Sequence, residues 1–366
     1  MSRLASRPVG ALVRDPETTA RQLTEWLTRV AGLHDVTVGE IEIPAATGFS
    51  NETILFDAGW RDGDAERSTH RLVVRIAPQS YTVFLEANFE AQFRVMQALG
   101  EHSDVPIPKM LWFEDDPAWF GSPFWIMERV DGQVPSDAPP YALEGWLHDA
   151  SPEQQTKLWW NGIAAMAAVH RVDWRALGLD FVDDPDRGER GVQQQLRYYE
   201  EALAWAEAAE DGRPHAGARA AVEWLAEHQP DSPPDEATIV WGDARLGNQM
   251  SRDGQIVAVL DWEMVALGDP RIDLGWWIFC DDVLSTGTGG SRLPGFPSAT
   301  ATVERWEALT GREAGDLQWF LVFAALRFTV VMLRLSTLLT AMGYSPEPFG
   351  YDNPISNALD GLLAAT

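Results

Sequence analysis

The sequence predicts an α+β protein of two lobes, a small β-rich lobe over 1–130 and a larger, mainly helical lobe over 131–366. Short apolar runs typical of strands dominate the first part of the chain, whereas helix-length apolar periodicity dominates the second. A polar, Pro-rich stretch at 133–140, which follows Asp131-Gly132, separates the two patterns. We therefore expect the boundary between the lobes at this stretch.

The amino-terminal lobe begins with a predicted helix, because Asp15 suits the N-cap and Pro16 the first helical position. Strands are expected at 35–43, 52–56, 71–76, 109–114 and 124–130. Between the third and fourth of these, helical spacing of apolar residues predicts a helix over 84–99.

The carboxy-terminal lobe is predicted to be helical at 152–170, 192–207, 216–228, 301–310 and 316–342. Strands are expected to interrupt this run only within 238–262. The stretch 287–297 is rich in Gly, Pro and Ser, which predicts a mobile loop, either a lid or a plain connection.

Composition narrows the range of partners. The chain has 366 residues, of which 45% are hydrophobic, and 17 tryptophans, enough for a large core. Its formal charge of −27 should repel nucleic acid and anionic membranes and favour cationic ligands. We expect neither nucleic acid nor a membrane as a partner, and a nucleoside triphosphate entering this field would need local cations and Mg²⁺.

Several features indicate a cytoplasmic protein. The single cysteine, Cys280, rules out an internal disulfide framework and fits a reducing compartment. The first residues lack the apolar stretch of a signal peptide. The apolar segment 319–335 is interrupted by Arg327 and Arg334, so it predicts a buried helix rather than a membrane span. The oligomeric state does not follow from the sequence.

The segment 238–262 carries the strongest chemical signal. Two apolar runs each end in an aspartate, Asp243 and Asp261, and Asn248 lies between them. Carboxylate and amide oxygens suit Mg²⁺ and a phosphorylated ligand. Asp253-Gly254 is a hairpin-turn signal, which would pair 246–250 with 256–260 and bring the three side chains together. The alternative is a surface hairpin with solvated acids.

The interval between Asp243 and Asn248 is that of the D-x-x-x-x-N arrangement of protein kinases. With the stretches 124–132, 168–174, 241–248 and 260–274 in this order, the chain resembles the aminoglycoside phosphotransferase-like family of kinase-fold enzymes. It is most similar to the branch of acyl-CoA dehydrogenase-associated kinase domains. The resemblance spans roughly 20–340 and implies a bilobed, protein-kinase-like fold. One departure is Trp241, which stands where the family usually has a histidine that supports the catalytic loop.

The resemblance implies a role for each residue of this segment. Asp243 would orient the acceptor hydroxyl and accept its proton, and Asn248 and Asp261 would bind Mg²⁺. Arg245 would either assist the phosphate or form a structural salt bridge. Two further acids of the segment 260–274, Asp269 and Asp273, are expected to be structural, and so is His170 within 168–174.

The nucleotide site rests on weaker signals. A small-residue turn at Gly48, Ser50 and Asn51 would cover the phosphates, with a plain turn as the alternative. Arg75 stands where kinases have the lysine that pairs with the α- and β-phosphates. Its acidic partner would be Glu90, with Glu86 as the other candidate, unless either acid only pairs locally with Arg94.

The resemblance places Gln92 at the usual position of that acidic partner. Backbone groups around Glu128 and Val130 would meet the purine, and the sequence does not distinguish ATP from GTP.

These signals together predict a Mg²⁺-dependent kinase that transfers the γ-phosphoryl group of ATP or GTP to a hydroxyl of a small molecule. The negative field favours a cationic acceptor, whereas the narrower resemblance indicates a metabolic one such as a hydroxyacyl thioester. One alternative is a nucleotide-binding pseudokinase without turnover, which the departures at Trp241 and Gln92 would explain. Another is a metal-dependent hydrolase, for which a nucleotide-binding lobe would be superfluous.

Overall fold

The computed structural model of the chain describes residues 14–44, 51–61, 66–79, 81–86, 88–209 and 212–366. The chain divides into two compact units. The amino-terminal unit comprises 1–97, 108–130 and 339–346, and the carboxy-terminal unit comprises 98–107, 131–338 and 347–366. The main division thus follows Val130, while two short segments belong to the unit opposite to the one expected from their position in the sequence.

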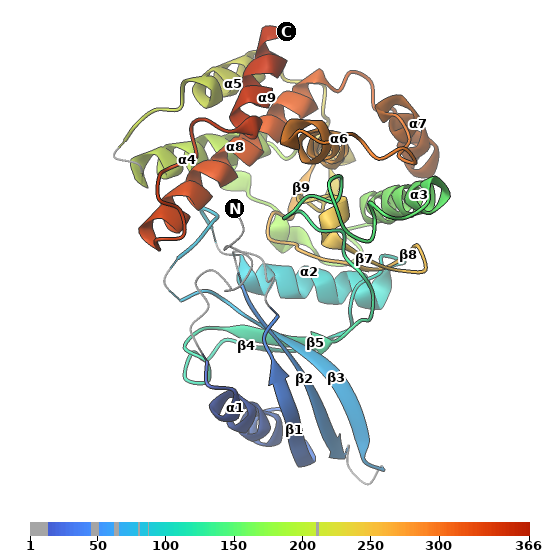
Figure 1. Cartoon of the computed structure of the whole chain (residues 1–366), viewed down its shortest axis with the longest axis vertical. Helices are drawn as coiled ribbons and strands as arrows, with labels where there is room; N and C mark the ends of the chain where they lie inside the picture. Colours follow the sequence, from blue (N-terminus) through green and yellow to red (C-terminus); the bar gives the residue numbers. More distant parts are fainter. Residues whose placement is uncertain (1–13, 45–50, 62–65, 80, 87, 210–211) are drawn as a thin grey trace. The chain divides into compact units, whose positions relative to one another are not determined.

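The amino-terminal unit is built on a five-stranded antiparallel sheet in the order β1-β2-β3-β5-β4 (Figure 1). Its strands are β1 (His34–Glu42), β2 (Glu52–Arg61), β3 (Ser68–Ile76), β4 (Met110–Glu114) and β5 (Phe124–Glu128). All five strands were predicted, and β2 extends beyond its predicted end.

A helix packs on each face of this sheet. Helix α1 (Pro16–Arg29) places Leu23 and Trp26 in a core cluster with Phe56 of β2 and Ile126 of β5. The Asp15 side chain accepts a hydrogen bond from the Thr18 amide, which confirms the predicted N-cap.

The opposite face of the sheet carries α2 (Phe89–His102), which begins later than predicted. The Phe89 ring stacks on Trp125 of β5 with 4.1 Å between ring centroids, and Phe93 lies 5.5 Å from Phe113 of β4. Period-two alternation along β5 therefore sends Trp125 to α2 and Ile126 to α1.

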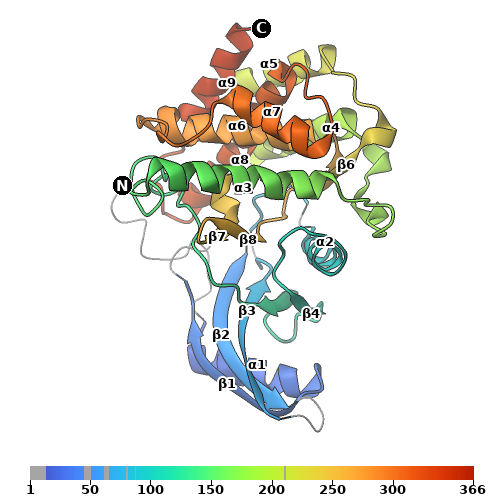
Figure 2. The same ribbon diagram turned by 90° about the vertical axis from the view of Figure 1, so that its right-hand side faces the viewer.

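The carboxy-terminal unit is mainly helical (Figures 1 and 2). Its α-helices are α3 (Pro152–His170), α4 (Val192–Ala209), α5 (Ala216–Glu227), α6 (Arg271–Ser285), α7 (Ala299–Thr310), α8 (Gln318–Ala341) and α9 (Pro354–Ala364). Short 3₁₀ turns occupy Asp180–Val182, Pro185–Arg187, Pro234–Glu236, Leu246–Asn248 and Thr286–Thr288. Helix α6 begins at Arg271, directly after Asp269-Pro270, which the sequence indicates as a helix start. Helix α9 was not predicted, although Asn353 and Pro354 form a start signal for it.

Helix α8 forms the centre of this unit. It packs against α4, where the rings of Tyr199 and Phe323 lie 5.5 Å apart, and against α6, where Gly275 faces Phe320. Within the described ranges it is the one helix long and apolar enough to cross a membrane, and 56% of its apolar window is buried inside the structure. Arg327, in its middle, is 1% exposed. The predicted buried helix is thus confirmed.

Two small antiparallel pairs of strands surround Asp243, Asn248 and Asp261. β6 (Thr238–Val240) pairs with β9 (Ala266–Gly268), and β7 (Gln249–Arg252) pairs with β8 (Gln255–Val259). Between β7 and β8, Asp253 and Gly254 have φ values of 54° and 74°, as the Asp-Gly hairpin turn requires. The predicted hairpin is confirmed, whereas β9 was not predicted.

The segment 287–297 is an anchored connection. Arg292 donates through Nε to Asp281 Oδ2 at 2.5 Å and through Nη1 to the Phe296 carbonyl at 2.8 Å. The Gly295 amide donates to Gln155 Oε1 of α3 at 2.9 Å. These bonds favour the plain connection over the lid among the two interpretations of the sequence.

The close approach of α6 to α8 gives a stability prediction. A Cβ atom at Gly275 would lie 2.8 Å from the Phe320 carbonyl oxygen, so Gly275→Ala should destabilise the fold by about 1–3 kcal/mol. Gly361, inside α9, has open space around its Cβ position, and Gly361→Ala should stabilise the fold by roughly 0.5–1 kcal/mol. Urea denaturation of the two variants measures both effects, and equal shifts would contradict the predicted contact.

Candidate active site

The predicted catalytic loop leaves β6 through a turn that only glycine allows. Gly242 has φ 93°, and a Cβ atom there would lie 2.1 Å from the Met264 carbonyl oxygen. The next residue is Asp243, whose side chain is 14% exposed. The glycine therefore lets the loop pass close to the segment after Asp261 while presenting Asp243.

A buried aspartate holds this loop. Asp273 of α6 is fully buried, and its Oδ2 and Oδ1 accept the backbone amides of Trp241 and Gly242 at 2.7 and 2.8 Å. His170 Nε2 lies 2.9 Å from Asp273 Oδ2, and the Trp306 indole donates to His170 Nδ1 at 2.9 Å. Because an indole N–H can only donate, Nδ1 must accept, so the imidazole proton is on Nε2 and points at Asp273. The predicted structural roles of Asp273 and His170 are confirmed.

Trp241 links the loop to the second aspartate. Its side chain is fully buried, and its indole N–H lies 2.9 Å from the Leu260 carbonyl oxygen and 3.1 Å from that of Asp261. The residue that replaces the usual histidine thus supplies a neutral donor that fixes the backbone at Asp261.

Asp243 accepts hydrogen bonds from three side chains. Arg245 Nε and the Trp276 indole donate to Oδ1 at 2.9 and 2.8 Å, and Asn248 Nδ2 donates to Oδ2 at 2.6 Å. Sequence reasoning gave Asn248 and Arg245 but not Trp276, which lies on α6, 33 residues further along the chain.

The structure also brings Asn248 and Asp261 together. The Leu260 amide donates to the Asn248 carbonyl oxygen at 2.9 Å, and Asp261 follows directly with φ 61°. Because the side-chain amide nitrogen of Asn248 donates to Asp243, the side-chain oxygen of Asn248 is the atom suited to a cation. An amide oxygen and a carboxylate are ligands that fit Mg²⁺, which commonly completes its shell with water and phosphate oxygens.

Arg245 forms salt bridges to two carboxylates, Asp243 and Asp137. Burial alone would lower the pKa of Arg245, but the charges of Asp137 and Asp243 raise it well above its ordinary value. Of the two roles that the sequence left open, the salt bridge is the one observed. Asp137, from the stretch that separates the predicted lobes, was not foreseen as its partner.

Part of the predicted nucleotide site can be located in the amino-terminal unit. Gly48 and Ser50 lie outside the described residues. Asn51 directly precedes β2 and is buried. Arg75 lies near the end of β3, at the sheet position opposite Thr53 of β2 on one side and Trp125 of β5 on the other.

The remaining predicted residues lie on α2 and at the end of β5. Glu90 is exposed and 3.9 Å from Arg94 Nη1, which favours the local ion pair that the sequence left open. Gln92 is buried. The Glu128 amide donates to the Lys109 carbonyl at 2.9 Å, so this N–H already has a backbone acceptor. Val130 follows β5 and is half-buried.

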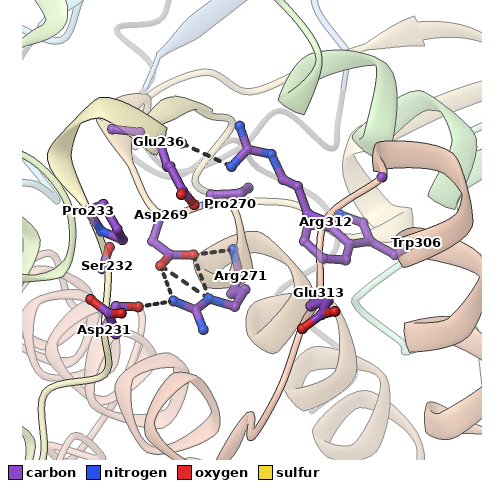
Figure 3. A pocket seen from close by; sticks show the side chains of 12 residues that line it. Asp231, Ser232, Pro233, Glu236, Asp269, Pro270, Arg271, Trp306, Arg312 and Glu313 are labelled. Atoms are coloured by element: carbon purple, nitrogen blue, oxygen red, sulfur yellow. Dashed lines mark hydrogen bonds and ion pairs between the residues drawn. The ribbon is translucent and has the colours of Figure 1, made fainter.

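A polar pocket of about 360 Å³ lies at the start of α6 (Figure 3). In it, Asp269 accepts the amide and the guanidinium of Arg271 at 2.6 to 3.1 Å, and Arg312 donates to the Glu236 carbonyl at 3.0 Å. Asp243 does not line this pocket. The structural role predicted for Asp269 is confirmed by these bonds.

Comparison with known proteins identifies the family of the chain. A family model described as the phosphotransferase enzyme family matches residues 43–311. The chain belongs to this family. Membership supports phosphoryl transfer to a small molecule and confirms the resemblance inferred from the sequence.

Curated relatives place the chain near the acyl-CoA dehydrogenase-associated branch. It is 28% identical over 235 residues to the "Probable acyl-CoA dehydrogenase IBR3" of Arabidopsis thaliana, covering 63% of this chain and 26% of that protein. It is 31% identical over 274 residues to acyl-CoA dehydrogenase family member 10 of Mus musculus, covering 74% and 23%. The chain spans about a quarter of the length of these relatives.

Solved structures share the bilobed, kinase-like fold. A "putative aminoglycoside phosphotransferase" of Ralstonia eutropha has a TM-score of 0.68 and 25% identity, with 94% of this chain and 98% of that chain covered. The macrolide 2′-phosphotransferase MphH of Brachybacterium faecium has a TM-score of 0.52 and 18% identity, with 93% and 97% covered. The predicted α+β kinase-like fold is confirmed.

The bracing of the catalytic loop can be tested without an assay of activity. Asp273→Asn keeps the shape but turns one acceptor oxygen into a donor, so a buried N–H loses its partner and the free energy of unfolding should fall by about 1–3 kcal/mol. The same substitution at Asp282, an exposed aspartate of α6, should leave stability nearly unchanged. Equal stabilities in urea would contradict the bracing role.

Proposed function

We propose that this protein transfers the γ-phosphoryl group of ATP or GTP to a hydroxyl group of a small molecule, with Mg²⁺ as cofactor. The observation that carries the proposal is the joined geometry of Asp243, Asn248 and Asp261. Asp243 and Asn248 are hydrogen-bonded through their side chains, and Asn248 is hydrogen-bonded through its carbonyl to the residue before Asp261. Such transfer depends mainly on positioning and charge stabilisation, which a rigid set of oxygen ligands supplies.

In the proposed reaction, Asp243 orients the acceptor hydroxyl through Oδ2 and takes its proton. The acceptor oxygen forms a bond to the γ-phosphorus while the bond from that phosphorus to the β–γ bridging oxygen breaks, and the nucleoside diphosphate leaves. Asn248 and Asp261 would hold Mg²⁺, which supplies charge neutralisation at the β- and γ-phosphates. Arg245 holds Asp243 and Asp137 through its two salt bridges.

For the donor, we propose that Arg75 pairs with the phosphates, that the turn at Gly48, Ser50 and Asn51 covers them, and that backbone groups of Glu128 and Val130 meet the purine. Solved neighbours have been captured with both kinds of nucleotide: a mutant of APH(4)-Ia with AMP-PNP and hygromycin B, and APH(2″)-IIIa with GDP and kanamycin. Either triphosphate is therefore compatible with this fold.

For the acceptor, we propose a hydroxylated metabolite, with hydroxyacyl thioesters as the first class to test. The curated relatives at 28% and 31% identity are named as acyl-CoA dehydrogenase family proteins, whereas the APH(4)-Ia neighbour with hygromycin B is 16% identical. The net charge of −27 favours a cationic acceptor instead, so amino sugars and macrolides form the second class. We place the reaction in the cytoplasm, which the single, buried Cys280 supports.

The direct experiment measures ATP and GTP turnover with Mg²⁺ against hydroxyacyl-CoAs, amino sugars, macrolides and choline-like alcohols. Turnover with at least one acceptor, lost in Asp243→Ala, is the expected result. Nucleotide binding in a thermal-shift assay with no turnover for any acceptor would instead make the protein a pseudokinase.

The roles of the two aspartates can be separated from general damage. Asp243→Asn and Asp261→Asn should each lower kcat by about 10²–10⁴-fold, because one removes the proton acceptor and the other a charged metal ligand. Asp253→Asn is the matched control, since it changes an exposed aspartate of the β7–β8 turn and asparagine tolerates its φ of 54°. Only Asp261→Asn should also raise the Mg²⁺ concentration needed for half-maximal rate. Unchanged kcat in both variants would contradict the assignment.

A further inference from the structure

We propose that Trp276 is a positioning residue for phosphoryl transfer: its indole N–H holds Oδ1 of Asp243, so that Oδ2 is kept for the acceptor hydroxyl. The inference rests on the proposed function and adds to it a residue outside the catalytic loop. Three observations carry it: the hydrogen bonds to the Asp243 carboxylate, the way the indole itself is held, and the contrast with the neighbouring Trp277.

The two oxygens of Asp243 have different surroundings. Oδ1 accepts from both the Trp276 indole, at 2.8 Å, and Arg245 Nε, at 2.9 Å. Oδ2 accepts from Asn248 Nδ2 at 2.6 Å. A carboxylate oxygen has two lone pairs, so two donors occupy Oδ1 whereas Oδ2 keeps one position. The remaining lone pair of Oδ2 is therefore the one that can accept the proton of the acceptor hydroxyl.

The donors on Oδ1 are not equivalent. Arg245 divides its guanidinium between Asp243 and Asp137, so its position also depends on Asp137. The Trp276 indole has one N–H, and Asp243 receives it. Because an indole N–H can only donate, this bond restricts the rotation of the carboxylate.

Trp276 is itself held against the loop. Its side chain is 2% exposed, and the Arg327 guanidinium lies over its ring, 4.6 Å from the centroid. Arg327 Nη2 also donates to the Gly242 carbonyl oxygen at 2.6 Å. One buried arginine of α8 thus contacts both the ring that fixes Asp243 and the backbone that immediately precedes Asp243.

The adjacent residue offers a matched control. Trp277 is on the same helix and is also 2% exposed, but within the part of the chain that the structure describes its indole nitrogen has no hydrogen-bond partner. Replacing either tryptophan by phenylalanine removes an N–H from a buried ring of α6. Of these two N–H groups, only that of Trp276 donates to the carboxylate of Asp243 in the unmodified protein.

The test compares Trp276→Phe with Trp277→Phe in the full chain, using the donor and acceptor that the turnover panel identifies. Trp276→Phe should lower kcat by about 10- to 100-fold with KM values nearly unchanged, because a misplaced acceptor affects the chemical step. Trp277→Phe should change kcat less than about 3-fold.

A spectroscopic readout keeps the inference testable independently of turnover. The indole ¹⁵N–¹H signal that is missing in Trp276→Phe should shift in Asp243→Asn, while the signal missing in Trp277→Phe should not. Overlapping kcat values for the two phenylalanine variants, or a Trp276 signal that is unchanged in Asp243→Asn, would overturn the inference while leaving the proposed function intact. Absence of turnover in the unmodified protein, with the signal still shifting, would instead sink the proposed function and with it the catalytic meaning of the bond.

Discussion

The structure of the site depends on the two hydrogen bonds that Asp273 accepts from the backbone of Trp241 and Gly242. A buried carboxylate is costly unless its oxygens are satisfied, and here backbone amides and a histidine satisfy them. The cost of burying the charge thus favours this loop geometry, because a path without the two amides would leave His170 as the remaining donor to Asp273. The position of the loop that presents Asp243 is therefore determined by Asp273 of α6.

A second constraint is the concentration of negative charge. In a chain of net charge −27, the loop residue Asp243 has the carboxylate of Asp137 near it through Arg245, and Trp241 of the loop contacts the backbone of Asp261. Arg245 offsets part of this charge by joining Asp137 to Asp243, and the indole of Trp276 stabilises Asp243 without adding a charge. In the proposed function, Asn248 and Asp261 are the residues that would hold the metal beside this balanced carboxylate.

The sequence predicted the parts of this arrangement that are local along the chain. The spacing of Asp243 and Asn248, and the Asp253-Gly254 turn, determine short-range geometry, so the hairpin and the side-chain pair followed from them. Trp276 and Asp137 reach Asp243 and Arg245 only through tertiary packing, and no spacing rule relates them. Helix α9 was missed for a related reason, because a helix start signal does not specify what the helix packs against. The partner of Glu90 was left open, because the sequence alone does not specify which cation an acidic residue contacts.

The tryptophan that replaces the family's histidine fits a wider use of indoles around the loop. Trp241 donates to the carbonyls of Leu260 and Asp261, Trp276 to Asp243, and Trp306 to His170. An imidazole in these places could reverse its donor and acceptor roles or gain a proton, whereas an indole can only donate. Each of these acceptors therefore faces a group that can only donate. The imidazole of His170 is held in a single tautomer by Trp306. The departure at Trp241 consequently preserves the bracing of the loop, because the backbone amide that Asp273 accepts is independent of the side chain and the indole adds a contact to the strand end that carries Asp261.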